Sequence, residues 1–228
     1  MDDKNPIVIP DRQLARLGGT DAISLLQKLA TQDLAFLTDN DGIAYSLLLS
    51  PQGRYLFDFF VMRRDGQLWL DMPAAQANAL IETLNRYKLR ADTSIDPVAE
   101  QQVYLAAAGD ETLRDPRHPE LGYRLWGDLL PEAAGNYMEK RIALGIVEPS
   151  IDMQSGVDLP LDFDLDKLNA ISFTKGCFPG QELTARTHHR QKARYTIVNL
   201  PLDEVGNNRI IAQVSNRTLV QVRRDSAN

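Results

Sequence analysis

The chain has 228 residues, a net charge of −6 and a sequence pI of about 5.1, and 43% of its residues are hydrophobic. This acidic balance argues against broad electrostatic binding of nucleic acid or anionic membrane, and no apolar run reaches the roughly 18 residues of a membrane span. The single cysteine cannot form an internal disulfide, and the start MDDKNPIVIPDRQ has neither a secretory core nor an Arg-rich transit pattern. We therefore expect a cytoplasmic globular protein with one large domain or two intertwined smaller ones.

The first half of the chain predicts a helix followed by an antiparallel meander. A cap-like Gly-Gly-Thr-Asp start precedes apolar residues at helical spacing, so we expect a helix near 21–30. Three strand-like runs follow, separated by two turns that contain Gly and Asp or Pro. The runs are IAYSLLL, RYLFDFFVM and LWLDM, at residues 43–49, 54–62 and 68–72.

The second half alternates helical and irregular patterns. Pro73 at a first-turn position opens a helical pattern over 74–89, with Leu80, Ile81, Leu84 and Tyr87 on one side, and a strand is expected near 102–107. Two prolines and a glycine make 115–126 an irregular crossing between subdomains. Helical periodicity returns over 131–146, and 146–170 is predicted to be a long functional or packing loop. Because regular βαβ alternation is missing, we predict the α+β class.

The lone cysteine lies in the octapeptide KGCFPGQE at residues 175–182. ISFTKG predicts a strand, FPGQ a type II turn, and QELTARTHHR a helix with Glu182 and Arg186 paired at i and i+4. The helix N-terminus and Lys175 would favour the Cys177 thiolate, and Gly176 permits close approach of a ligand. Such a thiolate could attack carbon, form a disulfide or bind a soft metal, whereas the alternative is a small buried packing residue.

Residues 175–194 carry five Lys or Arg side chains and one carboxylate, so the positive charge of this acidic chain is local. The segment is either a solvated helix face or a surface that binds an anion. His188 and His189 diverge by about 100° on a helix, so we expect no metal site. The sequence shows no Walker loop, G-x-S-x-G or C-x-x-C motif, and no complete catalytic constellation can be read from it.

Asp58 is a further candidate, because on its predicted strand it shares a face with Leu56 and Phe60. An unpaired carboxylate on an apolar face is costly. Asp58 therefore either binds a polar group or lies on an exposed edge strand.

Several segments occur together in order over residues 12–195: LGGTDAISLLQKLATQDL, YSLLLSPQGRYLFDFFV, LRDPRHPELGYR, RIALGI and FTKGCFPGQELTARTHHR. The chain thereby resembles the folate-binding protein YgfZ family, whose hallmark is K-G-C-[FY]-x-G-Q-E and which is related to the glycine cleavage aminomethyltransferase (T-protein). The resemblance implies a tetrahydrofolate-binding protein that supports assembly or repair of iron–sulfur enzymes, in a family linked with tRNA modification. It draws attention to Lys175, Gly176, Cys177, Gly180, Gln181 and Glu182.

The implied fold is aminomethyltransferase-like, with interleaved antiparallel-sheet subdomains and flanking helices. We expect a folate-binding core over 1–195, in which the 43–126 meander and helix form an inserted subdomain, and an abbreviated C-terminal β-barrel segment over 196–228. Only 34 residues follow Arg194, enough for about three short strands.

A pterin requires an apolar slot and a carboxylate, and a glutamate tail requires cations. Within the resemblance, Cys177 and Lys175 are the candidate catalytic pair. The candidate folate ligands are Asp58, Asp162, Gly176, Gln181, Glu182, Arg186 and Arg190, with Tyr45, Phe57 and Phe178 as slot residues and Lys192 and Arg194 as further tail partners. The chain departs from the related patterns where Phe57-Asp58 replaces paired acids and where Asp162 and Asp164 stand in place of P-x-E-x-N.

The predicted function is that of a folate-dependent accessory factor whose partners are folate and iron–sulfur client or assembly proteins. One alternative is aminomethyltransferase-like one-carbon transfer, which the missing acid beside Asp58 disfavours. The other is an RNA-binding module that uses 186–194, and the lack of a stacking aromatic there, apart from Tyr195, weakens it.

Overall fold

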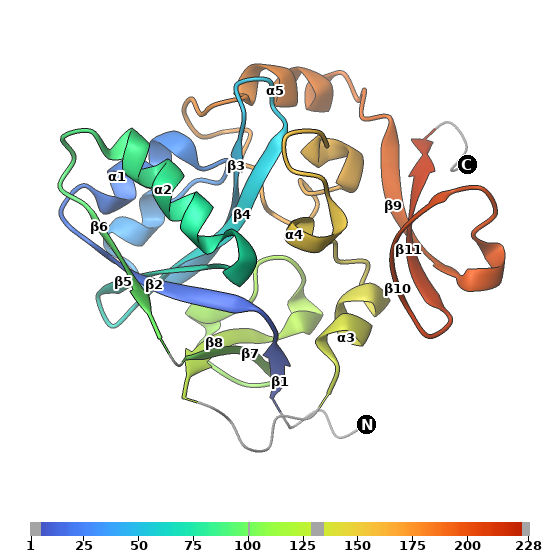
Figure 1. The fold of residues 1–228 in the computed structure, drawn as a ribbon, viewed down its shortest axis with the longest axis horizontal. Coiled ribbons are helices and arrows are strands. Elements are labelled where there is room, and N and C mark those ends of the chain that lie inside the picture. Colours follow the sequence, from blue (N-terminus) through green and yellow to red (C-terminus); the bar gives the residue numbers. More distant parts are fainter. Residues whose placement is uncertain (1–5, 100, 129–134, 225–228) are drawn as a thin grey trace.

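The computed structural model describes residues 6–99, 101–128 and 135–224, and within them the chain forms three antiparallel sheets with flanking helices (Figure 1). The largest sheet has the strand order β3-β4-β5-β2-β6. Its strands are β2 (Arg12–Gly18), β3 (Gly42–Leu49), β4 (Tyr55–Arg64), β5 (Gln67–Pro73) and β6 (Ser94–Val98). The predicted meander is confirmed as β3, β4 and β5, whose strands pair in chain order.

Two smaller sheets complete the β structure. One has the order β1-β7-β8 and contains β1 (Ile7–Ile9), β7 (Gln102–Ala106) and β8 (Tyr123–Gly127). The other has the order β10-β11-β9 and contains β9 (Tyr195–Pro201), β10 (Arg209–Val214) and β11 (Arg217–Arg223). The α+β class and the three short C-terminal strands are therefore confirmed, while the domain boundaries at 43, 126 and 195 stay predictions.

Five α-helices are seen in the described residues: α1 (Ala22–Leu29), α2 (Ala77–Lys88), α3 (Tyr137–Ala143), α4 (Pro149–Asp152) and α5 (Gln181–His189). The predicted helices near 21–30, 74–89 and 181–190 are confirmed. The helix predicted over 131–146 is confirmed from Tyr137, and residues 131–134 lie outside the described residues. Among the described residues, none of the helices has the length and apolar character that crossing a bilayer requires.

Some local predictions are wrong. Pro73 ends β5 instead of opening α2, and Tyr87 is 48% exposed because the buried side of α2 is formed by Leu80 and Leu84. The 115–126 segment includes most of β8, and no strand forms over 171–176. Residues 171–176 instead bond to the end of α1 and the loop after it, through the Ser172 amide and the Lys175 side chain.

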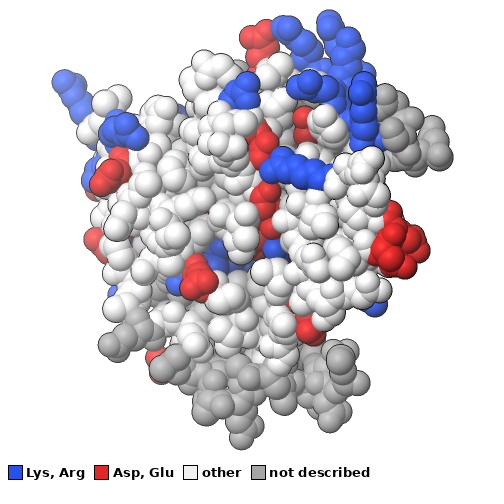
Figure 2. All heavy atoms as spheres, turned by 45° about the vertical axis from the view of Figure 1, so that its right-hand side comes forward, with Lys and Arg blue, Asp and Glu red and all other residues white. Residues whose placement is uncertain are grey.

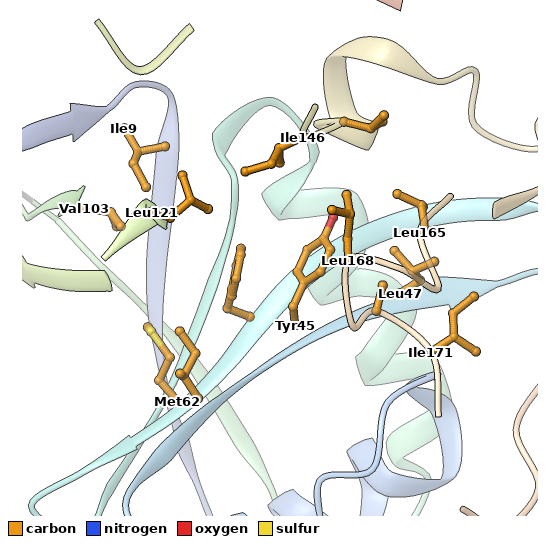
Figure 3. Close-up of a cluster of buried hydrophobic side chains, with 14 of the residues drawn as sticks. Ile9, Tyr45, Leu47, Met62, Val103, Leu121, Ile146, Leu165, Leu168 and Ile171 are labelled. Atoms are coloured by element: carbon orange, nitrogen blue, oxygen red, sulfur yellow. The ribbon is translucent and has the colours of Figure 1, made fainter. Parts of the chain in front are cut away.

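The central sheet is buried on both faces, which explains the nearly continuous apolar run of β3. Helices α1 and α2 cover the face formed by Ala44, Leu48, Phe59 and Val61. On the other face, Tyr45, Leu47 and Met62 pack against residues from the β1-β7-β8 sheet and from the 146–171 segment (Figure 3). Because successive strand residues face opposite sides, Phe57 packs with the helical layer while Tyr45 lies in the other core.

Candidate functional site

Residues 170–181, here called the Cys177 segment, connect the 146–171 region to α5. The predicted type II turn is confirmed, since Gly180 has φ 80° and ψ 0° and the Gln181 amide donates to the Phe178 carbonyl at 3.2 Å. Helix α5 starts directly after this turn. Cys177 is a free, exposed thiol, so its alternative interpretation as a buried packing residue is wrong.

Gly180 brings this turn against the turn between β3 and β4. A Cβ atom on Gly180 would lie 2.6 Å from the Ser50 carbonyl oxygen and 2.7 Å from Gly53 Cα. With φ at +80° as well, the position requires glycine for two independent reasons. The sequence showed the Pro-Gly turn, but not that its glycine contacts a second glycine 127 positions earlier.

Lys175 is only 8% exposed, so its ammonium is not a free cation at the surface. Its ammonium donates to the carbonyl oxygens of Gln27 at 2.7 Å, Ala30 at 2.6 Å and Gln32 at 3.1 Å. Burial lowers the pKa of Lys175 to about 8, against the opposing effect of the Asp33 carboxylate. The catalytic role of Lys175 stays a prediction. Its ammonium binds one carbonyl in the last turn of α1, the carbonyl of the C-cap residue Ala30 and one in the loop that follows.

The candidate ligands in the octapeptide and the basic helix lie at the surface. Gly176 and Glu182 are exposed, Gln181 is half-buried, and Arg186 forms the predicted i, i+4 ion pair with Glu182. The exposed cations that follow are Arg190, Lys192 and Arg194. Figure 2 shows Lys and Arg side chains gathered at the upper edge of the molecule, where Figure 1 places α5 and the start of β9.

Asp162 fastens the C-terminal sheet to the core. Its carboxylate accepts the Arg194 amide at 2.7 Å, and its carbonyl accepts the Gln221 side chain at 3.1 Å. Asp164 likewise accepts the Thr196 hydroxyl at 2.6 Å. A cavity of about 180 Å³ beneath α5 is lined by Asp162, Lys192 and Arg194 together with Leu183, Thr184 and Thr187. The structure thus brings Asp162 together with Lys192 and Arg194, the two residues predicted as further partners of the glutamate tail.

Asp58 lies elsewhere, on the face of β4 that carries Phe60, and its exposure is 0%. The Tyr55 hydroxyl donates to one carboxylate oxygen at 2.8 Å and the Tyr45 hydroxyl to the other at 3.4 Å. Burial and the nearby Glu148 carboxylate raise the pKa of Asp58 to about 6. The edge-strand alternative is wrong, because β4 pairs on both sides.

The raised pKa predicts how stability depends on pH. The native Asp58 binds a proton below about pH 6, whereas the unfolded chain releases it near pH 4, so its ionisation costs stability as pH rises through this interval. Asp58→Asn should be more stable than the parent by about 3 kcal/mol at pH 7.5, and most of this difference should be lost by pH 4. Urea unfolding at both pH values tests this. Asp65→Asn, at an exposed side chain, is the control and should show no such crossover.

A buried ionic network surrounds the Phe60 ring beside Asp58. Arg12 contacts Asp71 at 2.7 Å and Glu148 at 3.2 Å, Arg117 contacts Asp115 at 2.8 Å and Glu148 at 3.0 Å, and Arg124 contacts Asp71 at 2.6 Å. All three guanidinium groups lie within 5.8 Å of the Phe60 ring centroid. The sequence analysis missed this network, although DPR and LGYR were among the segments that carried the family resemblance.

A second cavity, of about 360 Å³, is within the size range of small-molecule sites. Its lining includes Tyr45, Phe36, Ile43, Gln32, Asp33 and Asn169. An aromatic ring, apolar walls, a carboxylate and two amides suit a flat polar heterocycle such as a pterin. Tyr45 also links the cavity to Asp58 through its hydroxyl, and neither cavity is lined by Cys177.

Sequence comparison finds relatives along most of the chain. It is 31% identical over 225 residues to the iron–sulfur cluster assembly factor IBA57 homolog, mitochondrial, of Mycosarcoma maydis, covering 84% of this chain and 56% of the relative. It is 31% identical to the mouse iron–sulfur cluster assembly factor IBA57, mitochondrial (84% and 64%), and to the human one (78% and 61%). The chain thus spans between half and two thirds of the length of these curated relatives. No family model matches the sequence.

Structural comparison supports the predicted fold. The crystal structure of glycine cleavage system aminomethyltransferase T from Bartonella henselae superposes with a TM-score of 0.72. The match has 16% sequence identity and covers 96% of this chain and 79% of that one. The chain therefore has the fold of aminomethyltransferase T, and its homologues are proteins named as iron–sulfur cluster assembly factors.

Proposed function

We propose that this protein is a tetrahydrofolate-binding accessory factor in the assembly or repair of iron–sulfur proteins, with Cys177 as its functional thiol. The observation that carries the proposal is an exposed thiol at a fixed place: the turn after it packs on the β3–β4 turn, and the lysine before it binds the end of α1. The names of the relatives, the aminomethyltransferase T fold and the KGCFPGQE resemblance support the cluster-assembly role. Iron–sulfur client or assembly proteins are the partners this role requires.

Folate binding is supported by the cavity that Tyr45 lines. Phe36 would contact the ring and Asp33 would supply the carboxylate at the cavity wall, while Tyr45, which is 0% exposed, would support the wall from the core side. Asp58 would act on the site through the Tyr45 hydroxyl, because it is buried behind that side chain. When bound, tetrahydrofolate supplies a carrier for a one-carbon unit. The roles of Asp162, Gly176, Gln181, Glu182, Arg186 and Arg190 in folate binding stay predictions.

The compartment stays a prediction too. The sequence predicts the cytoplasm, whereas the relatives are named as mitochondrial proteins. A reducing environment suits the exposed Cys177 in either case.

Thermal shift tests folate binding. A ligand at 100 times its Kd stabilises the native state by about 2.7 kcal/mol, so tetrahydrofolate should raise Tm by roughly 5–10 °C. Phe36→Ala should weaken binding about tenfold by removing a cavity wall. Tyr87→Ala is the matched control, since Tyr87 is 48% exposed and Phe36 45%, and Tyr87 lines neither cavity. The absence of a shift at millimolar tetrahydrofolate would refute the folate proposal.

The basic segment has its own test. Replacing Arg186, Arg190 and Lys192 with Gln should weaken polyglutamylated folate more than the monoglutamate, because only the longer tail brings extra carboxylates. Titration calorimetry with both ligands measures the difference. The control is a triple Gln variant at the C-terminal end of α2, in which Arg86, Lys88 and Arg90 are replaced. It removes the same charge and should affect the two ligands equally. Equal losses in the α5 variant would assign its cations to the fold or to a protein partner.

A further inference from the structure

Lys175 closes the end of α1. The last carbonyls of a helix have no amide partners within it, and they carry the negative end of the helix dipole. The Lys175 ammonium donates hydrogen bonds to the carbonyl oxygens of Gln27, Ala30 and Gln32, all at 3.1 Å or less. An ammonium has three N–H donors, so these three carbonyls use all of them, and none is left for a thiolate at Cys177.

The residues before Lys175 are tied to the same loop. The Thr31 hydroxyl donates to the Ala170 carbonyl at 2.6 Å, and the Ser172 amide donates to the Thr31 carbonyl at 3.0 Å. The Ser172 hydroxyl in turn accepts the Lys175 amide at 3.2 Å. The Phe173 ring stacks on His188 of α5, with ring centroids 3.7 Å apart.

The residues after Cys177 are held independently. Phe178 is buried, and Gly180 contacts the backbone of the β3–β4 turn. Between the two attachments only Gly176 and Cys177 are exposed, and a Cβ on Gly176 would meet nothing within 4 Å. The thiol is thus at the exposed crest of a short segment whose two ends are fixed.

We infer that Lys175 is a positioning residue: by binding the carbonyls at the end of α1 it fixes the place of Cys177, and it does not activate the thiol by its charge. This inference rests on the proposed function of Cys177. It replaces the role that the sequence suggested for Lys175, in which a nearby cation favours the thiolate.

Two substitutions separate the two roles. Lys175→Met removes the charge and the three bonds, whereas Lys175→Arg keeps the charge but places a planar guanidinium where a compact ammonium binds three carbonyls. If Lys175 positions Cys177, both variants should increase amide hydrogen exchange over 174–178 at least tenfold while exchange in α2 is unchanged. The pH midpoint for alkylation of Cys177 by iodoacetamide should stay within about 0.3 unit of the parent in both variants.

An electrostatic role gives the opposite result and would overturn the inference. The alkylation midpoint would then rise by about one unit or more in Lys175→Met and return in Lys175→Arg. Unchanged exchange over 174–178 in both variants would overturn it as well. If Lys175→Met fails to fold, Ser172→Ala provides a second variant, because it loses the bonds of its hydroxyl to the Lys175 amide and to Thr174 but keeps the Lys175 ammonium in place. It should show a smaller increase in exchange over the same residues.

The effect on function needs a control for stability. Val220 is buried in the separate core cluster of the C-terminal sheet, so Val220→Ala should lower Tm without altering the Cys177 segment. This variant should still restore iron–sulfur enzyme activity in cells that lack the native protein. Lys175→Met and Lys175→Arg should fail to restore it at a temperature where both are folded, and restoration by either would overturn the positioning role. If Cys177→Ser also restores activity, the proposed function fails, and the exchange and alkylation results still decide where Lys175 acts.

Discussion

Cys177→Ser should abolish the ability of the protein to restore iron–sulfur enzyme activity in cells that lack it, while leaving folding and folate affinity nearly unchanged. The substitution is almost isosteric, and the thiol is exposed, so its replacement should alter stability by less than about 0.5 kcal/mol. Neither cavity is lined by Cys177, so folate binding should keep the parent Kd. Tm, tetrahydrofolate titration and complementation on the same variant measure the three properties.

Thr174→Ala is the matched control for this experiment. Thr174 is exposed in the same segment, three positions before Cys177, and its hydroxyl contacts only the Ser172 hydroxyl, at 3.3 Å. The variant should complement fully. Complementation by a folded Cys177→Ser protein would remove the case for thiol chemistry, because every packing function of the side chain is retained by serine.

The sequence predicts local features of this fold well. The meander follows from apolar runs separated by a Pro-Gln-Gly turn and an Asp-Gly turn, and α5 follows from the type II turn that contains Gly180. Strands β2 and β6 are less readable. RQLARLG has a weak alternation, and β6 contains Pro97, which an edge strand tolerates. Such strands are specified by the neighbours they pair with more than by their own residues.

The site is harder to predict, because its contacts join distant parts of the chain. Lys175 binds carbonyls 143 to 148 residues earlier, and backbone carbonyls leave no trace in the residue pattern. The role of Cys177 could be suggested from its turn, but its exposure could not. Asp58 illustrates both cases. The strand alternation placed it correctly on an apolar face, where burial raises its pKa, yet the Glu148 carboxylate that raises it further and the Arg12 guanidinium that lowers it come from distant parts of the chain.

The buried network gives the largest expected loss of stability. The Arg117 side chain is 0% exposed and contacts Asp115, Glu148, the Tyr137 hydroxyl at 3.1 Å and the Phe60 ring. Arg117→Met would leave two buried carboxylates without this cation. Removing one partner of a buried ion pair typically costs about 3–5 kcal/mol, so the variant should unfold at much lower urea at pH 7. Arg114→Met, at a half-exposed pair with Glu111 nearby in sequence, should change the urea midpoint far less.

The pH dependence of unfolding tests whether the loss of stability in Arg117→Met comes from the ionic network. Arg117 and Arg12 hold the pKa of Glu148 at about 2, below its ordinary value near 4.5, so this carboxylate stabilises the native state above pH 4.5 and loses that contribution as pH falls toward 2. With Arg117 replaced, the folded and unfolded pKa values of Glu148 should move closer, and the parent and variant should converge in stability as the solution is acidified. A variant with parental stability at pH 7 would mean that Met fills the site beside Phe60 as well as the ionic network does, as apolar replacements of some buried ion pairs do. Equal destabilisation from pH 7 to pH 3 would instead point to lost packing around Phe60, because a packing loss does not depend on the ionisation of Glu148.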